Sequence, residues 1–294
     1  MLERALPHFN RSPARRHRPA RLSALWPALS LALALALAWG AAAPAQAQGV
    51  SESVGKNSAF TGLVSASQVE QAAVQQYGQM LREAQAKNAL GSDNHPQVLR
   101  LRNIARRIIP FSYGWNPRAR EWRWEVNLIG SKQINAFCMP GGKIAFYTGI
   151  LDQLKLSDDE VAMVMGHEIA HALREHARER MGKSAATNIG VNVLSQVLGF
   201  GQVGQTLTQY GAQLLTLEFS REDESEADLV GMELAARAGY DPRAGVTLWE
   251  KMGAASKGAP PQFLSTHPSG KTRIADIERN LPKVMPLYEA SRQR

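Results

Sequence analysis

The residues best suited to chemistry in this 294-residue chain are His167, Glu168 and His171, which form the pattern H-E-x-x-H. On a helix that turns about 100° per residue, His171 lies about 40° around the axis from His167 and one turn along it, so both rings can bind one metal ion. Glu168 lies about 100° from His167, where it can activate an attacking water without binding the metal. The pattern therefore predicts zinc-dependent hydrolysis.

The same pattern also fits a charged helix whose histidines merely face solvent or a core partner. Two observations weigh against that interpretation. The residues before the motif are apolar, which predicts a buried helix: Val161, Ala162, Met163, Val164 and Met165. An acidic segment further along the chain could also complete a metal site.

A catalytic zinc site uses three protein ligands, so a third ligand is required beside the two histidines. His176 lies about 180° around a continuous helix from His167, and we expect it to point away from the metal, at the surface or behind the ligands. A longer zinc pattern needs Gly at position 174 and His at position 177, where this chain has Arg174 and Ala177. His176 is therefore rejected as a ligand.

Acidic candidates for the third ligand lie between positions 220 and 228. Glu224 with Asp228 share a helix face, and so do Glu222 with Glu226. One acid of a pair could bind zinc while the other orients a ligand histidine. An acidic helix start that only faces solvent is the simpler interpretation. Spacing alone does not choose among these.

The elements that must position these residues follow from local patterns. Ser157 with Glu160 forms a capping box that begins a helix, and we expect it to run from about Asp158 to Met181. Other predicted helices cover residues 67–89, 96–109, about 220–239, a segment opening at 241–242, and about 270–280, with helical sequence through 184–216.

A change of period marks a small sheet. Apolar residues alternate from Trp122 to Leu128, and two further strands, 135–139 and 143–148, flank Pro140-Gly141-Gly142. The predicted fold class is therefore α+β, mostly helical, with a small sheet at about residues 121–149 beside the H-E-x-x-H helix.

Residues 1–47 are predicted to be a signal peptide, because six arginines precede an apolar run (25–43) that ends in Ala45-Gln46-Ala47. An uncleaved membrane anchor is the competing interpretation. The remaining residues, 48–294, form the predicted zinc metallopeptidase domain, with no membrane span in the mature chain. This part has 28 basic and 25 acidic residues, too even a balance to predict nucleic-acid binding. The lone Cys138 allows no internal disulfide.

Several motifs together resemble the HtpX/CAAX prenyl endopeptidase family of zinc metallopeptidases. They are His167-Glu168-x-x-His171, Ser220-Arg221, Glu224-x-x-Ala227-Asp228, Asn135-Ala136-Phe137 before Pro140-Gly141-Gly142, and His267-Pro268 before Arg273-Ile274. The likeness is greatest to small, single-domain periplasmic members such as LoiP and YcaL, since the helical-repeat domain of the related BepA has no counterpart in this sequence. It implies a gluzincin fold and one Zn²⁺ per chain.

The resemblance also assigns roles to residues. It implies that Glu224 is the third zinc ligand, and that Asp228 and Arg273 support the ligands from behind. Asn135, Ala136 and Phe137 would lie on an edge strand that pairs with an extended peptide. His267 would lie near the zinc, where it either donates to the developing oxyanion or occupies the open zinc position in a resting form.

The function implied is a zinc-dependent endopeptidase of the periplasm that cleaves unfolded or misfolded envelope proteins, with the outer-membrane assembly machinery as a partner. Two other classes stay open. One is a chaperone or assembly factor whose zinc site is usually latent, and the other is a zinc hydrolase that acts on small molecules. The edge strand favours a peptide substrate over a small one, because small molecules have no use for backbone pairing.

Overall fold

The computed structural model describes residues 49–197, 211, 214, 217–256, 261–267 and 272–293. Three sequence-based expectations lie outside these residues: the signal peptide at 1–47, most of the helical sequence at 198–216, and Pro268 of the downstream motif. Among the described residues, no helix is both long and apolar enough to cross a membrane.

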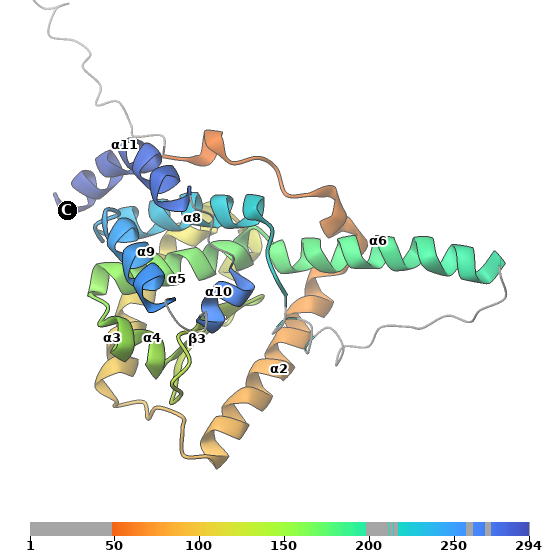
Figure 1. The fold of residues 1–294 in the computed structure, drawn as a ribbon, viewed down its shortest axis with the longest axis horizontal. Coiled ribbons are helices and arrows are strands. Elements are labelled where there is room, and N and C mark those ends of the chain that lie inside the picture. Colours follow the sequence, from red (N-terminus) through yellow and green to blue (C-terminus); the bar gives the residue numbers. More distant parts are fainter. Residues whose placement is uncertain are drawn as a thin grey trace, which may run out of the picture. The chain divides into compact units, whose positions relative to one another are not determined.

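The described residues are mostly helical, as predicted, with one small sheet (Figure 1). The α-helices are α2 (Ala66–Ala86), α3 (Pro96–Ile108), α4 (Thr148–Leu154), α5 (Asp158–Leu173), α6 (His176–Val197), α8 (Arg221–Arg237), α9 (Ala244–Ala255), α10 (Gln262–Thr266) and α11 (Arg273–Ser291). Short 3₁₀ turns are η1 (Ser51–Ser53), η2 (Ala59–Leu63), η3 (Ile109–Gly114) and η4 (Pro117–Arg120).

The sheet has the order β1-β3-β2, with β1 (Glu125–Ile129) parallel and β2 (Ala136–Met139) antiparallel to β3 (Lys143–Tyr147). Strand β2 is thus an edge strand among the described residues, as the resemblance implied. The first strand begins at Glu125, three residues later than the predicted start at Trp122. The preceding segment is instead fixed by side chains, since the indole N–H of Trp122 donates to Glu70 and that of Trp124 donates to the carbonyl of Ala119.

Helix α5 lies at the centre of the core, and its capping box at Ser157 and Glu160 is present as predicted. All residues from Glu160 to Leu173 on this helix are buried. Helix α5 packs against α8 (Arg221–Arg237) at two glycines: a Cβ on Gly166 would lie 2.6 Å from the carbonyl oxygen of Gly231. The missing side chains let the two backbones touch, which brings the acids of α8 beside the histidines of α5.

The predicted continuous helix from Asp158 to Met181 is wrong, because it breaks between α5 and α6. Arg174 ends the first helix, and Glu175 has φ +57°, a left-handed conformation that only a minority of non-glycine residues adopt. The break redirects the chain, so His176 no longer lies where helical periodicity placed it.

The last helix also differs, since α11 extends to Ser291 rather than ending near Asn280. It contains Pro282 and Pro286, each of which lacks a backbone N–H. Val284 and Leu287 between and after them are buried in the main core, and this burial offsets the lost hydrogen bonds.

The segment 49–64, here called the N-terminal strap, runs from the side of α11 to α6 before α2 begins (Figure 1, orange). Val50 is fully buried and its N–H donates to Glu233 of α8 at 2.5 Å. Lys283 of α11 bonds Ser53, and Arg178 of α6 donates to the carbonyl of Val64. The strap therefore links the start of the described chain to three helices of its C-terminal half, α6, α8 and α11.

Candidate metal centre

The two histidines of H-E-x-x-H lie on one face of α5, as the spacing predicted. Their Nε2 atoms are 3.0 Å apart, and both side chains are buried. A separation this short between two ring nitrogens is what two ligands of one ion require. The apolar residues before His167 bury α5 in the core, and this burial keeps both rings out of bulk solvent.

Glu224 of α8 reaches the same point. Its two carboxylate oxygens lie 3.3 Å from His171 Nε2 and 3.5 Å from His167 Nε2. Ser220 caps the helix in a capping box with Asp223, which fixes where α8 begins. Of the two acidic pairs that spacing left open, the structure brings Glu224 with Asp228 to the histidines. Glu222 is exposed and Glu226 faces a different partner.

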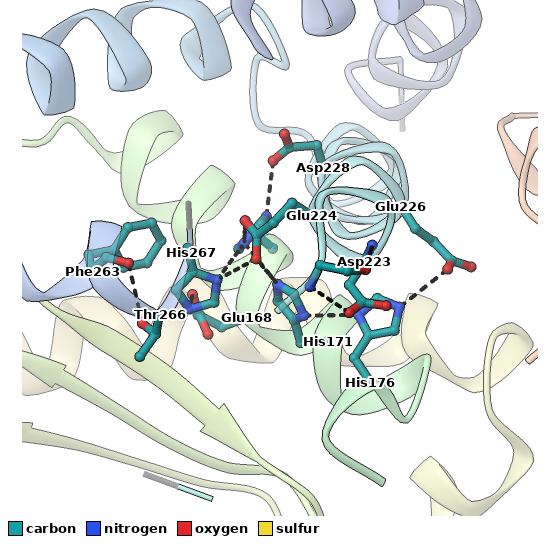
Figure 2. Close-up of polar contacts among 12 residues, drawn as sticks. Glu168, His171, His176, Asp223, Glu224, Glu226, Asp228, Phe263, Thr266 and His267 are labelled. Carbon is teal, nitrogen blue, oxygen red and sulfur yellow. Dashed lines mark hydrogen bonds and ion pairs between the residues drawn. The ribbon is translucent and has the colours of Figure 1, made fainter. Parts of the chain in front are cut away.

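His267, which directly follows α10, completes a group of four possible ligands (Figure 2). Its Nδ1 lies 2.9 Å from Glu224 Oε1 and 3.3 Å from His167 Nε2. One ligand atom from each of His167, His171, Glu224 and His267 can be chosen so that all lie within 4.8 Å of one another. The ring stacks on Phe263, with 4.5 Å between centroids, so its position is set by packing.

Asp228 and Arg273, which the resemblance assigned to the support of the ligands, contact His167 and Glu224. Asp228 Oδ1 lies 3.0 Å from His167 Nδ1, and the guanidinium of Arg273 donates to both oxygens of Asp228 and, at 2.6 Å, to Glu224. Arg273 is 6% exposed and lies 3.7 Å over the ring of Trp249. Burial opposes ionisation of Asp228, but the charge of Arg273 holds its pKa below the usual range.

Glu168 has a buried carboxylate oxygen that is left without a hydrogen-bond partner. Its Oε1 is the one buried side-chain oxygen or nitrogen in the described part of the chain that has no hydrogen-bond partner. The nearest ring nitrogen, His267 Nε2, is 3.5 Å away. Leaving such an oxygen unsatisfied costs free energy, which a polar ligand or water beside the four ligand atoms would recover. The donor set and this oxygen together fit a bound metal ion.

Burial and close charges shift the pKa values at the centre. Burial raises the pKa of Glu168 and lowers that of His171 well below its usual value. Burial alone would also raise the pKa of Glu224, but hydrogen bonds from His171 and His267 hold it below the usual range. For His267, burial is outweighed by the charge of Glu168 and the hydrogen bond to Glu224, so its pKa is raised.

A cavity of about 290 Å³ opens between β2 and these residues. Glu168, His171 and His267 line one side, and Asn135, Ala136 and Phe137, predicted to bind substrate, lie on the other. Much of the remaining lining is apolar: Met80, Cys138, Met139, Pro140, Tyr147, Ala177, Leu214, Leu217 and Phe219. The predicted catalytic and substrate-binding residues therefore face one cavity.

Two residues of the centre were missed or misjudged from sequence. His176 does not lie at the surface: it is 1% exposed and its Nδ1 is 2.9 Å from His171 Nδ1 (Figure 2). The alternative position behind the ligands is the one observed, although the helix break, not helical periodicity, puts it there. Phe219 stacks on His171 at 4.0 Å between centroids, and no sequence pattern had singled it out.

The fold and the centre define a metallopeptidase domain of the zincin type, and comparison with known proteins agrees. Residues 97–281 match the profile of peptidase family M48, so the chain belongs to this family. Membership of this family confirms two expectations: the chain is a metallopeptidase, and its metal is zinc. The match does not single out the small periplasmic members.

Individual relatives come from two groups. The chain is 44% identical over 150 residues to mitochondrial metalloendopeptidase OMA1 of Arabidopsis thaliana, covering 51% of this chain and 30% of the relative. It is 38% identical over 200 residues to the Schizosaccharomyces pombe OMA1, covering 67% and 57%. It is 31% identical over 176 residues to the beta-barrel assembly-enhancing protease of Escherichia coli, covering 56% and 36%. The chain thus spans about a third to three fifths of the length of these relatives.

Proposed function

We propose that this chain is a zinc-dependent endopeptidase in which His167, His171 and Glu224 hold one zinc ion. The observation that carries the proposal is the unsatisfied Glu168 Oε1 beside the ligand atoms, at the wall of a cavity that an edge strand also lines. Three protein ligands and one open position are the arrangement of catalytic zinc sites.

The mechanism follows from the positions of the side chains. When bound, zinc polarises the peptide carbonyl and lowers the pKa of the attacking water. Glu168 takes the proton of that water and passes it to the leaving amine. Asp228 accepts a hydrogen bond from His167 and so keeps its other ring nitrogen free for the metal. Arg273 offsets part of the negative charge of two carboxylates, Glu224 and Asp228, to both of which it donates.

The first test is zinc content and casein cleavage of the purified protein. We expect one zinc per chain, cleavage that stops when a chelator removes the metal, and recovery when zinc is restored. Glu224→Ala should lose most of its zinc and its activity, because two imidazoles alone bind zinc weakly. A wild-type protein without zinc, or with zinc and no cleavage of any protein substrate, would contradict the proposal.

Substrate binding is proposed to use the open edge of β2. The carbonyl of Asn135 accepts from the N–H of Tyr147, so by the alternation of antiparallel pairing the backbone groups of Ala136 and Cys138 point away from β3. Without substrate, the N–H of Ala136 donates to the side-chain oxygen Oδ1 of Asn135. In the complex, a backbone carbonyl of the substrate would replace Asn135 Oδ1 as the acceptor of this N–H.

This pairing predicts a pattern in modified substrates. In a cleavable peptide whose backbone nitrogens are methylated one at a time, cleavage should fall at alternate positions on one side of the scissile bond. The reason is that every second N–H of an edge-paired strand faces its partner strand. The measurement is kcat/KM for each peptide by mass spectrometry. Equal losses at consecutive positions would argue against strand pairing.

His267 is proposed to act at the fourth position of the centre, either on the oxyanion or as a resting ligand that displaces water. Its closeness to three other ligand residues supports both versions. We expect His267→Phe to lower turnover sharply and to retain zinc, as loss of an oxyanion donor would. Turnover and zinc content are measured together. A rise in turnover would instead favour the resting ligand, and with it a latent, chaperone-like protein, whereas unchanged turnover would remove His267 from the mechanism.

The biological setting is also a proposal. Residues 1–47 direct the chain to the periplasm as a cleaved signal peptide, and residues 48–294 act there on unfolded or misfolded envelope proteins. The name of the Escherichia coli relative, a beta-barrel assembly-enhancing protease, supports a link to outer-membrane assembly. The OMA1 relatives are mitochondrial by name, so fractionation of cells and sequencing of the mature N-terminus test the location.

A further inference from the structure

A chain of hydrogen-bonding groups lies behind His171 and has no part in the mechanism above. His176 Nδ1 is 2.9 Å from His171 Nδ1, and His176 Nε2 is 3.2 Å from Glu226 Oε2 (Figure 2). The other oxygen of Glu226 accepts from Arg174 Nε at 2.5 Å, and Arg174 also donates to the carbonyl of Gly55 in the N-terminal strap. An unbroken series of hydrogen-bonding contacts thus connects the strap to His171, a predicted zinc ligand.

The ring nitrogens in this chain have only one consistent assignment once His171 binds a metal. His171 Nε2 faces the other ligand atoms, 3.0 Å from His167 Nε2, so its proton must be on Nδ1. His171 Nδ1–H then donates to His176 Nδ1, which leaves the proton of His176 on Nε2. That N–H donates to the carboxylate of Glu226. Every donor meets an acceptor, and the opposite tautomer of His176 would place two N–H groups against each other.

His167 receives the same kind of support in one step, from Asp228. For His171, the carboxylate acts through a second histidine instead. A partner on the far ring nitrogen fixes the tautomer and ring orientation of a ligand histidine and raises its basicity. His176 is 1% exposed, so bulk water cannot readily replace this partner.

We propose that His176 and Glu226 are positioning residues for zinc binding, which hold His171 in the ligand tautomer through a two-step relay anchored by Arg174. This inference rests on the proposed role of His171 as a zinc ligand. Glu175, which has a positive φ, directly precedes His176, and the break between α5 and α6 at this residue brings His176 against the ring of His171.

The test is the zinc dissociation constant of the full-length protein, measured by competition of the metal-free form with a chromophoric chelator. His176→Leu keeps an apolar side chain in the buried site but removes both ring nitrogens, and we expect zinc binding about 10- to 100-fold weaker. His176→Asn should recover much of this loss, because its Oδ1 lies where the imidazole Nδ1 lies and can accept from His171. Glu226→Gln should weaken binding by less than His176→Leu.

Glu222→Gln is the matched control for Glu226→Gln. It makes the same change of charge one turn away on α8, but Glu222 is exposed and contacts none of the histidines. We expect its zinc affinity to equal that of the wild type. Thermal unfolding of the metal-free forms shows whether His176→Leu has lost its fold; if it has, the comparison of His176→Asn, Glu226→Gln and Glu222→Gln decides.

The proposal is overturned if folded His176→Leu binds zinc as tightly as the wild type, or if Glu222→Gln and Glu226→Gln weaken binding equally. Failure of the relay is distinct from failure of the proposed function. In the first case the wild type binds zinc and cleaves protein while the variants bind zinc normally, whereas in the second the wild type itself binds no zinc or cleaves nothing.

Discussion

Glu168→Gln should lower kcat/KM for protein cleavage by about 10²- to 10⁴-fold, the range for loss of a general base, while zinc remains bound. Glutamine has nearly the shape of glutamate, so the cavity and the ligands on α5 keep their geometry. It cannot take a proton from the attacking water. Casein cleavage and zinc content of the same preparation measure both effects. The peptide products of the wild type identify the casein bonds that the variant no longer cleaves.

The control for this variant is Glu121→Gln, the same substitution at an exposed glutamate that does not line the cavity. It should cleave casein like the wild type. Full activity in Glu168→Gln would mean that another group accepts the proton, and the unsatisfied oxygen of Glu168 would then need a different explanation. Loss of zinc with loss of activity would show that Glu168 helps to bind the metal.

Arg273→Met should destabilise the metal-free protein by about 3–5 kcal/mol, the usual effect of removing one partner of a buried ion pair. Methionine fills similar space over Trp249 but removes the guanidinium that pairs with the carboxylates of Glu224 and Asp228. Urea unfolding of the zinc-free form measures the change. Bound zinc would supply part of the missing positive charge, so the loss should be smaller in the zinc-loaded form.

Arg279→Met serves as the comparison, because Arg279 is on the same helix but its side chain is 70% exposed and paired only with Asp276. Pairs at the surface contribute little to stability. Arg273→Met should therefore unfold at a clearly lower urea concentration than Arg279→Met. Unfolding of Arg273→Met at the same urea concentration as Arg279→Met would show that the buried carboxylates are protonated or solvated when the arginine is absent.

Local signals in the sequence were enough for the ligand helix and the turn beside it. The capping box at Ser157, the apolar residues before His167 and the i, i+4 spacing of the histidines are all short-range features, and α5 has each of them. The glycine turn between β2 and β3 was likewise predictable, since Gly141 and Gly142 both have positive φ. Each of these features depends only on residues that are close neighbours in the sequence.

The third ligand could not be chosen from spacing, because the choice depends on how α8 is rotated against α5. That rotation is set by the contact of Gly166 with Gly231, a feature of two helices rather than one. Helical periodicity could not predict the position of His176 for a related reason. It depends on a left-handed residue at Glu175, and nothing in the sequence marks a glutamate for that conformation.

The N-terminal strap has a consequence for when the enzyme becomes competent during its own biogenesis. Its bonds from Val50 to Glu233 and from Ser53 to Lys283 join residues 183 and 230 positions apart, and contacts of such long sequence separation form late in folding. Gly55 of the strap holds Arg174, the outer end of the support for His171. A chain still emerging from the ribosome or a translocation channel has not yet supplied Glu233 and Lys283, which hold the strap at Val50 and Ser53, so we expect hydrolytic activity to arise only after these residues have emerged.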